Sequence, residues 1–362
     1  MDTNNALKSL ISRDLYNEIV RTTHHSVLET NKTCNNKTFL ITGANGFIAY
    51  YLVLTLLNAN DVFQHNNRVV LLVRSQEKAE KRYGEILNRN DVLLLIQDVC
   101  TPLSVSEKVD YVIHAASAAD AQHFDTDPIG VFNSNVIGTE NIINFVNQKK
   151  CEAAVYISSF TVYGQGTDRL EYIDESFSGI EPWDNNRACY PYGKRSAEFL
   201  CMAAARKYNS PIRIVRPGFV YGASHKNDTR VYSEIIRCVA DKKPIILNSP
   251  GLLYRSMVYV TDLVEAILAV LLQGKNGEAY NVAYEHVSIR QFAETAAAVA
   301  DSCDVCVQYS HVEDRSIAVP NQIFGAMSTR KLRDECGWSP RVCLSEGISS
   351  AAAILLSLPD EY

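Results

Sequence analysis

Residues 38–49 read TFLITGANGFIA, and this stretch decides the fold. A short apolar run, Thr38–Thr42, leads into a turn of small residues, Gly43-Ala-Asn-Gly46, and a second apolar segment follows it. The run predicts a buried strand, and the second segment predicts a helix over 47–58. Small residues at such a junction let the backbone approach a phosphate group, which the helix N-terminus attracts. The stretch therefore predicts the first strand–turn–helix unit of a dinucleotide-binding domain.

The same alternation continues along the chain as far as residue 217. Short apolar runs alternate with amphipathic or charged segments, and an alternation of strands with helices predicts a parallel sheet that helices cover on both faces. Right-handed crossovers then make it a doubly wound α/β sheet of the Rossmann type. Strands are expected at 68–73, 92–97, 109–114, 153–158 and 212–215, and helices at 76–88, 135–149 and 187–208.

The chain divides into three expected regions. Residues 1–36 form an N-terminal extension in which Leu7, Ile11 and Leu15 recur at four-residue steps, so a helix is expected over 6–28. Packing of this helix on its own domain is favoured over a role in a dimer. The nucleotide-binding domain is expected over 37–217 together with about 258–283. A smaller substrate-binding lobe is expected from 218–257 and 284–362.

Composition narrows the possible partners. The chain has 362 residues and a net charge of −6, which gives no electrostatic case for binding nucleic acid or an anionic membrane. No apolar stretch is long enough to cross a bilayer, and the polar start lacks the apolar core of a signal peptide. The ten cysteines are scattered and read as reduced thiols of a cytoplasmic protein. Only Cys303 and Cys306 have CxxC spacing, without a second pair, so no metal site is expected.

Two residues bear on the choice of dinucleotide. Arg74 follows the strand at 68–73, where an acid would suit the ribose of NAD and an arginine suits the 2′-phosphate of NADP. The position favours NADP, although Arg74 can also stack on adenine or lie in solvent. Asp98 follows the third strand, where it can accept a hydrogen bond from the adenine amine or serve only as a turn residue.

Tyr190 and Lys194 are the strongest catalytic candidates. They stand four residues apart near the start of the helix at 187–208, so their side chains share one face. The ammonium group and an oxidised nicotinamide are both expected to lower the tyrosine pKa, which lets the phenol move a proton during hydride transfer. Ser159, at the end of the fifth strand, can bond the same substrate oxygen. Tyr192 is a competing candidate for the proton-transferring tyrosine, but it has no lysine four residues further along the chain.

Several motifs together resemble the extended short-chain dehydrogenase/reductases. The five stretches TGANGFIA, HAAS, NVIGT, SSFTVYG and YPYGK begin at residues 42, 114, 135, 158 and 190. Their order and spacing resemble the nucleotide-sugar branch, the NAD-dependent epimerase/dehydratase family, over about residues 37–355. The resemblance implies bound NAD or NADP and a catalytic triad of Ser159, Tyr190 and Lys194. The cofactor-binding residues that follow are Gly43, Asn45, Gly46, Phe47, Ile48, Arg74, Asp98, Val99, Ala115, Ala116, Asn135, Tyr190, Lys194 and Pro217.

The residues expected to contact the substrate resemble one branch of the family, but they differ from it at positions that bear on the type of reaction. RACY at 187–190 and NDTRV at 227–231 resemble the UDP-glucuronate decarboxylases. The decarboxylases, however, carry a glutamate where this chain has Thr161, and the 4,6-dehydratases carry Asp-Glu at 160–161. Many relatives have asparagine where this chain has Phe219. The substrate-binding residues implied by the resemblance are Thr161, Phe219, Arg230 and Arg255. Arg230 belongs to the segment that resembles the nucleotide-binding loop, and Arg255 is expected to reach the substrate diphosphate or sugar.

These departures select the expected reaction. Phe160 and Thr161 cannot act as a carboxylic acid or carboxylate base, which disfavours dehydration and calls decarboxylation into question. We expect a cytoplasmic NAD(P)-dependent nucleotide-sugar epimerase or 4-keto-sugar reductase, acting in carbohydrate biosynthesis as a homodimer. Alternatives are a decarboxylase-like enzyme with altered acid–base residues, a reductase of a non-sugar ketone, and a non-catalytic dinucleotide sensor. The intact Ser159, Tyr190 and Lys194 count against the sensor.

Overall fold

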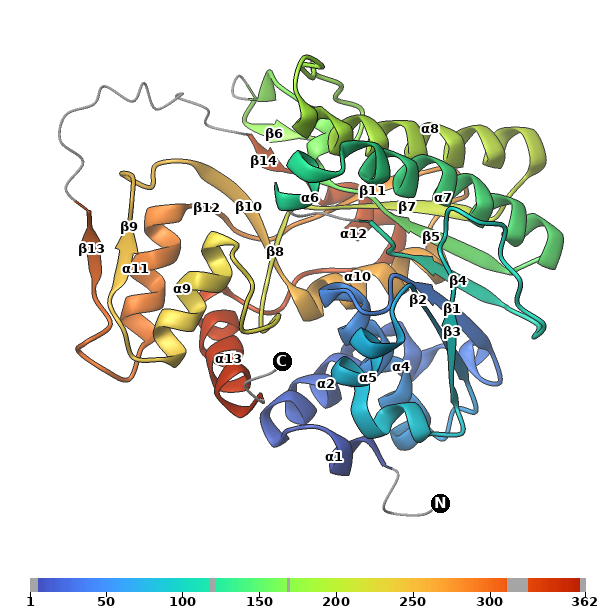
Figure 1. The fold of residues 1–362 in the computed structure, drawn as a ribbon, viewed down its shortest axis with the longest axis horizontal. Helices are drawn as coiled ribbons and strands as arrows, with labels where there is room; N and C mark the ends of the chain where they lie inside the picture. The colour runs from blue at the N-terminus through green and yellow to red at the C-terminus, as the bar shows by residue number, and fades with distance from the viewer. Residues whose placement is uncertain (1–5, 118–120, 168–169, 311–324, 359–362) are drawn as a thin grey trace.

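A seven-stranded parallel sheet forms the centre of the computed structural model, which describes residues 6–117, 121–167, 170–310 and 325–358 (Figure 1). The strand order is β11-β7-β5-β4-β1-β2-β3. The predicted doubly wound α/β sheet is therefore confirmed. The strands are β1 (Thr38–Thr42), β2 (Arg68–Val73), β3 (Val92–Ile96), β4 (Tyr111–His114), β5 (Ala153–Ile157), β7 (Ile212–Pro217) and β11 (Ala279–Val282).

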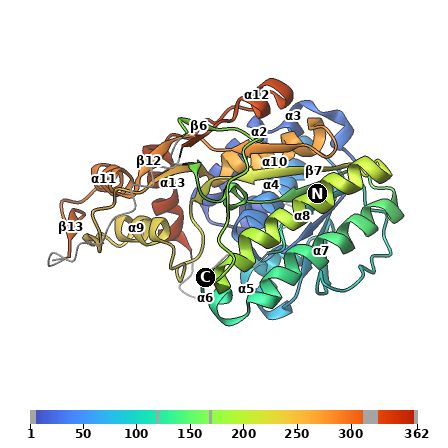
Figure 2. The ribbon, with the colours of Figure 1, turned by 90° about the horizontal axis from the view of Figure 1, so that it is seen from above.

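Helices cover both faces of this sheet, as Figures 1 and 2 show. The helices α7 (Pro128–Lys149) and α8 (Cys189–Tyr208) lie side by side on one face, and α4 (Phe47–Phe63) and α10 (Val260–Gln273) lie on the other. The two faces explain why β1 is apolar at successive positions: Leu40 packs in the core under α7 and α8, whereas Ile41 packs in the core under α4 and α10.

The N-terminal segment is three helices, so the expected single helix over 6–28 is wrong. These are α1 (Leu7–Leu10), α2 (Arg13–His25) and α3 (Val27–Thr30). Two serines break the segment, because the side chain of Ser12 accepts from the Leu15 amide and that of Ser26 from the Leu28 amide. Such caps end one helix and start the next.

This segment packs on the domain built around the central sheet, as favoured from its sequence. Leu7, Leu15 and Ile19 are buried in the core that contains α4 and α10. The Asn58 side chain donates to Thr23 Oγ1 at 2.9 Å, which joins α4 to α2. The helix α4 continues past the expected end at residue 58 to Phe63, and it ends before Gln64, whose φ of 56° is left-handed.

Other helix boundaries differ from the expected ones for local reasons. The helix α7 begins at Pro128 and not at 135, because the Asp127 side chain accepts from the Gly130 amide and Pro128 suits a first turn. The helix α5 (Gln76–Tyr83) ends before Gly84, whose φ of 48° interrupts it. The short 3₁₀ helices are η2 (Lys32–Cys34), η3 (Gly84–Asn88), η4 (Phe160–Tyr163) and η6 (Asn186–Ala188), and α6 (Ala121–Thr126) precedes α7.

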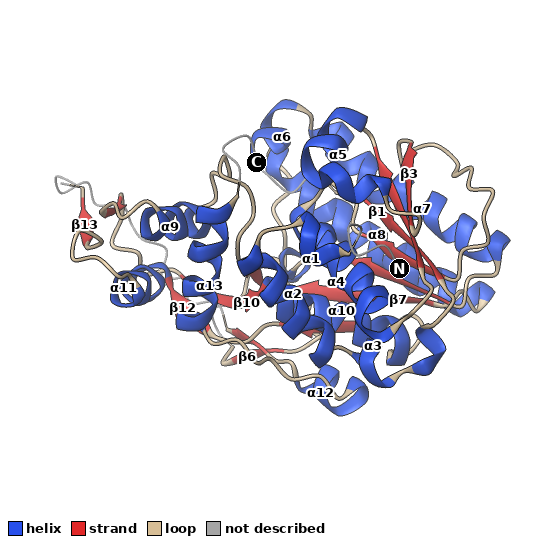
Figure 3. Ribbon diagram, turned by 90° about the horizontal axis from the view of Figure 1, so that it is seen from below, coloured by secondary structure: helices blue, strands red, loops and turns tan. Residues whose placement is uncertain are grey.

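Most of the remaining elements gather beyond the carboxyl ends of the central strands (Figures 1 and 3). A three-stranded sheet, β12-β10-β8, connects them to the central domain, and two pairs, β13-β9 and β14-β6, flank it. The bounds are β6 (Tyr172–Ile173), β8 (Phe219–Tyr221), α9 (Val231–Ala240), β9 (Ile245–Leu247), β10 (Tyr254–Tyr259), β12 (His286–Ser288), α11 (Ile289–Val299), β13 (Val307–Tyr309), β14 (Ala326–Met327), α12 (Arg330–Cys336) and α13 (Leu344–Ser357). Because α12 packs on α10 and β11, the 284–362 region also contributes to the central domain.

Membrane-spanning helices and clusters of metal ligands are both absent from the described residues. Within them, no helix is long and apolar enough to cross a membrane. Nor do the described histidine, cysteine, aspartate and glutamate side chains form any group of three that could hold a metal ion.

The packing of α2 leads to a stability prediction. Ile19 has no exposed surface, so Ile19→Ala should lower the free energy of unfolding by about 2–5 kcal/mol through lost burial and a residual cavity. Denaturant unfolding measures this change. The matched control is Arg13→Ala, because the Arg13 side chain is 87% exposed and its removal should change stability by no more than about 0.5 kcal/mol. Unchanged stability in Ile19→Ala, with a loss of self-association instead, would contradict this packing.

Candidate active site

The glycine turn brings two predicted cofactor-binding segments together. Gly43 has a φ of 64°, and a Cβ there would lie 2.7 Å from the Cα of Ala116. A residue with a side chain could not occupy this position without moving the backbone that follows β4. Ala115 and Ala116 therefore lie against the turn after β1, at the carboxyl edge of the sheet.

The turn ends at the N-terminus of α4, as expected for a phosphate-binding unit. Gly46 is the capping residue, and its amide donates to the Gly43 carbonyl at 2.8 Å. Phe47 and Ile48 begin the helix, whose first turn carries no acidic residue. Asn45 Oδ1 is buried without a hydrogen-bond partner among the described residues. A cradle that excludes a Cβ, a buried acceptor and an open helix N-terminus together fit the pyrophosphate and ribose of a dinucleotide.

The strand ends next to this turn carry the residues expected near adenosine. Arg74 follows β2 and is exposed, and the Asn45 side chain donates to the neighbouring Ser75 carbonyl at 3.3 Å. Asp98 Oδ1 accepts from the Cys100 amide at 2.8 Å, so it forms its own turn in this structure. Val99 is buried against Gly138 of α7. Contact of Arg74, Asp98 and Val99 with a cofactor remains a prediction.

A buried histidine, not singled out from the sequence, supports the turn. His114 Nδ1 lies 2.7 Å from Thr42 Oγ1, and its Nε2 lies 3.2 Å from Thr139 Oγ1. Thr42 Oγ1 also accepts from the Ala116 amide at 3.2 Å. Burial, and secondly the positive charge of Lys194, lower the pKa of His114 to about 3, so the ring is neutral at physiological pH. These bonds tie β1, β4 and α7 together beneath the glycine turn.

Asn135 lies in the same layer. Its Oδ1 accepts from Ser117 Oγ at 3.0 Å and from the Tyr156 hydroxyl at 3.3 Å, and its Nδ2 donates to the Val131 carbonyl at 2.8 Å. With its donors and acceptors used in this way, Asn135 positions Tyr156. Its expected contact with the cofactor stays a prediction, as does that of Pro217, which is buried at the end of β7.

The structure brings Ser159, Tyr190 and Lys194 together. The Ser159 hydroxyl is hydrogen-bonded to the Tyr190 phenol. Lys194 Nζ donates to the Ile157 carbonyl at 2.7 Å, at the end of β5, and lies 5.6 Å from the centre of the Tyr190 ring. The spacing on α8 and the position of Ser159 after β5 thus place all three side chains at one point. Their catalytic role remains a prediction.

The pKa of Tyr190 shifts in the direction opposite to the one expected from the sequence. Burial raises the pKa of Tyr190 to about 12, and the hydrogen bond from Ser159 acts against this rise. Burial also lowers the pKa of Lys194 to about 7, opposed by Glu198 and Cys201. The expected fall in the pKa of Tyr190 is therefore wrong when only the protein is considered. The cost of desolvating the phenolate is larger than the lowering effect of the neighbouring protein groups. A positively charged nicotinamide ring would act in the lowering direction.

Phe124, from α6, is a neighbour of the cluster that the sequence did not reveal. Its ring stacks on that of Tyr190, with centroids 5.1 Å apart and planes 30° apart. The contact covers one side of the phenol and contributes to its burial. No local pattern identifies Phe124, since α6 and α8 are distant in the sequence.

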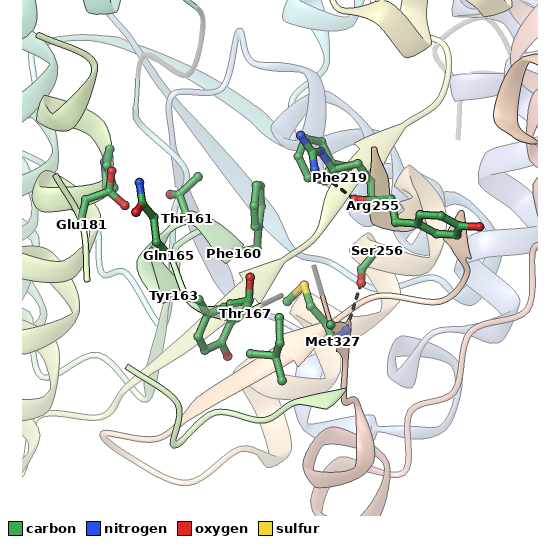
Figure 4. Close-up of a pocket in the computed structure, with 15 residues that line it drawn as sticks. Phe160, Thr161, Tyr163, Gln165, Thr167, Glu181, Phe219, Arg255, Ser256 and Met327 are labelled. Atoms are coloured by element: carbon green, nitrogen blue, oxygen red, sulfur yellow. Dashed lines mark hydrogen bonds between the residues drawn. The ribbon is translucent and has the colours of Figure 1, made fainter. Parts of the chain in front are cut away.

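A cavity of about 210 Å³ opens beside this cluster (Figure 4). Thr161, Phe219 and Arg255, all expected to bind substrate, line it. The Phe160 and Phe219 rings meet with centroids 4.4 Å apart, and the Arg255 guanidinium lies 4.9 Å from the centre of the Phe219 ring. The Phe219 ring therefore packs against Arg255, the positively charged residue of the cavity lining. Lining residues missed from the sequence include Gln165, Thr167, Glu181, Tyr254, Ser256 and Met327.

Arg230 is not part of this cavity lining. Its Nε donates to both carboxylate oxygens of Asp228 at 3.0 Å, and its guanidinium lies 5.4 Å from the centre of the Phe47 ring. The structure thus places Arg230 beside the N-terminus of α4 and not beside Thr161. Its contact with a nucleotide remains a prediction.

Comparison with known proteins identifies the family. The model of the NAD dependent epimerase/dehydratase family matches residues 39–283. The chain belongs to this family. Bovine (Bos taurus) dTDP-D-glucose 4,6-dehydratase is 28% identical over 326 residues, which is 86% of each chain. UDP-glucuronic acid decarboxylase 3 of Arabidopsis thaliana is 28% identical over 327 residues, covering 89% of this chain and 90% of the relative.

Solved structures share the fold of this family member. The dTDP-glucose 4,6-dehydratase of Bacillus anthracis, in complex with NAD, has a TM-score of 0.71 at 18% identity, covering 88% of this chain and 96% of that one. The UDP-glucuronic acid 4-epimerase of Bacillus cereus, in complex with NAD, has a TM-score of 0.69 at 21% identity, with the same coverage. The likeness at this identity shows a common fold, and the family resemblance inferred from the motifs is confirmed.

The buried Lys194 leads to a prediction about pH. The unfolded chain protonates this lysine near its ordinary pKa of 10.5, whereas the folded chain does so only near 7, so burial costs stability as pH falls between these values. Lys194→Met removes this cost. In nucleotide-free protein, the stability of the variant relative to the unchanged chain should be about 3 kcal/mol more favourable at about pH 6 than at about pH 9.

Denaturant unfolding at the two pH values measures this difference. The control is Lys78→Met, because Lys78 is exposed and its substitution should give the same small change at both pH values. An effect of Lys194→Met that does not depend on pH would show that Lys194 is not desolvated in the folded protein.

Proposed function

We propose that the protein is a nucleotide-sugar epimerase or 4-keto-sugar reductase that acts by hydride transfer with NAD(P). The observation that supports this most is the cluster of Ser159, Tyr190 and Lys194 at the carboxyl end of β5, beside a cavity that Arg255 lines. A proton-transferring phenol and a cationic binding group on one cavity suit the oxidation or reduction of a sugar that carries a diphosphate.

Each side chain of the cluster has a distinct role in this proposal. When bound, the nicotinamide accepts or supplies the hydride. Tyr190 moves the proton at the reacting sugar oxygen, and Ser159 donates a hydrogen bond to the same oxygen. Lys194, anchored on the Ile157 carbonyl, supplies the positive charge that favours the phenolate. Gly43, Asn45 and Gly46 would hold the dinucleotide, and the exposed Arg74 gives NADP a slight preference.

Phe160 and Thr161 favour hydride chemistry without further acid–base steps. Both line the cavity directly after Ser159, and neither side chain can donate or accept a proton as a carboxyl group does. Elimination of water needs an acid and a base in addition to the tyrosine. Epimerisation through a 4-keto sugar needs only the tyrosine, the serine and room for the sugar to turn.

A decarboxylase-like activity is the alternative. It is supported by the identity to the Arabidopsis decarboxylase and by Glu181, a carboxyl group on the cavity wall that is not in the position of Thr161. We favour the epimerase or reductase because one displaced carboxylate does not replace the residues missing at 160 and 161. A non-catalytic sensor would have no need of the assembled triad.

We further propose a cytoplasmic homodimer that forms through α7 and α8. These helices lie side by side over one face of the sheet (Figure 2). Ile129 and Phe199, one on each helix, are 72% and 66% exposed, which suits a helical interface between two copies.

A panel of nucleotide sugars with NAD⁺ and NADPH, analysed by mass spectrometry, tests the reaction class. We expect either an isomer of unchanged mass or a product that has gained two hydrogens. Tyr190→Phe should reduce turnover by a factor of about 100 or more, because it removes the proton-transferring group, while cofactor affinity stays the same.

The control for the variant is Tyr208→Phe, since Tyr208 lies at the far end of α8, is 60% exposed and does not line the cavity. Loss of carbon dioxide from UDP-glucuronate would establish the decarboxylase instead. Full activity of Tyr190→Phe would exclude the catalytic assignment.

A further inference from the structure

The cavity beside the catalytic cluster has two ends of opposite charge. Arg255 and Phe219 form one end, and Glu181 lies with Gln165 and Thr161 at the other, as Figure 4 shows. The first end suits the diphosphate of a nucleotide sugar. The second end, which the proposed function does not use, carries the only carboxyl group on the described lining of the cavity.

Backbone contacts fix the position of Glu181. The Gln165 amide donates to the Ile180 carbonyl at 2.7 Å, and the Gly179 amide donates to the Tyr163 carbonyl at 3.0 Å. Gly179 has no space for a side chain against the Gln165 carbonyl, so the two segments pack directly on each other. The chain around Glu181 is thus attached to the segment that begins at Ser159.

The helix that carries Tyr190 and Lys194 holds Glu181 from the other side. The Tyr192 hydroxyl donates to the Glu181 carbonyl at 2.7 Å. Arg195 donates to the Val162 and Gly179 carbonyls, each at 2.8 Å. Because η4 and α8 carry both the catalytic cluster and these anchors, Glu181 has a defined position relative to the reacting sugar.

The Glu181 carboxylate forms no hydrogen bond or ion pair among the described residues, although it lines the cavity. Polar groups in a folded protein are normally paired, so this carboxylate is available to a ligand that supplies donors. Thr161 Oγ1, at the same end, is also without a hydrogen-bond partner among the described residues, but it has almost no accessible surface.

The charge at this end decides which ligand fits. Burial raises the pKa of the Glu181 carboxyl, and the Arg195 guanidinium acts in the opposite direction. Arg195 does not line the cavity, and two of its N–H groups donate to the Val162 and Gly179 carbonyls. Sugar hydroxyl or ammonium groups can donate to Glu181, whereas a second carboxylate would meet a like charge in a partly desolvated site.

We propose that Glu181, beside Gln165 and Thr161, forms a sugar-binding subsite that accepts hydroxyl or amino groups and rejects a carboxylate. The substrate is then a nucleotide-linked neutral or amino sugar and not a nucleotide-linked uronate. This inference rests on the proposed function for the identity of the ligand, but it concerns binding and not hydride transfer. Glu181 acts here as a specificity-determining residue, and no step of the reaction is assigned to it.

Binding of two matched ligands by titration calorimetry tests this subsite. The ligands carry glucose or glucuronate on the same nucleoside diphosphate, UDP or dTDP, whichever binds more tightly as the free diphosphate. The unchanged protein should bind the glucose ligand at least about tenfold more tightly. Glu181→Gln should bring the two affinities to within about twofold, mainly by tightening the binding of the glucuronate ligand.

A matched control separates the subsite from a general charge effect. Asp184 is exposed on the same loop and does not line the cavity, so Asp184→Asn removes the same charge and should leave the preference unchanged. The affinity for the free diphosphate should be equal in all three proteins, which shows that each has an intact cationic end.

The outcomes distinguish this proposal from the proposed function. Equal affinities or tighter binding of glucuronate by the unchanged protein would overturn the subsite, as would an unchanged preference in Glu181→Gln. A preference that Glu181→Gln abolishes supports the subsite even if no hydride transfer is detected. The absence of hydride transfer in that case would reject only the proposed reaction class.

Discussion

The hydrogen bond from Lys194 Nζ to the Ile157 carbonyl is the contact on which the candidate site depends. It joins the first turns of α8 to the carboxyl end of β5, and it does so with a charge that burial disfavours. The same short region of α8 supplies Tyr190, and the residues after β5 supply Ser159, Phe160 and Thr161. One contact thus sets the position of the phenol, the hydroxyl and the cavity wall relative to the sheet.

Burial at this point has opposite effects on the two ionisable side chains. It raises the pKa of Tyr190 and lowers that of Lys194, so the cluster favours its uncharged forms when only the protein is considered. A positively charged ligand next to the phenol would act against this effect, since it favours the phenolate. In this account the dinucleotide has an electrostatic role in addition to hydride transfer, and the protein provides the low-dielectric surroundings in which that role is large.

Much of this arrangement could be predicted from the sequence because it follows from local patterns. The alternation of apolar strands and helices indicated the parallel sheet, and the four-residue spacing of Tyr190 and Lys194 indicated their common face. Other features depend on contacts between distant segments. Phe124 reaches Tyr190 through the packing of α6 on η6, which directly precedes α8, and Glu181 reaches the cavity through bonds to the segment after Ser159. Arg230 is directed toward Phe47 by its ion pair with Asp228, which motif resemblance does not reveal.

The central claim is that Tyr190 moves the proton that accompanies hydride transfer between a nucleotide sugar and the nicotinamide. Rapid mixing of the NAD⁺-loaded protein with a nucleotide sugar that it converts, followed by the absorbance of reduced nicotinamide, tests this most directly. The account predicts a transient rise whose rate increases with pH in the unchanged protein, and no rise in Tyr190→Phe despite normal binding of both ligands. A rise of equal rate in Tyr190→Phe would contradict it.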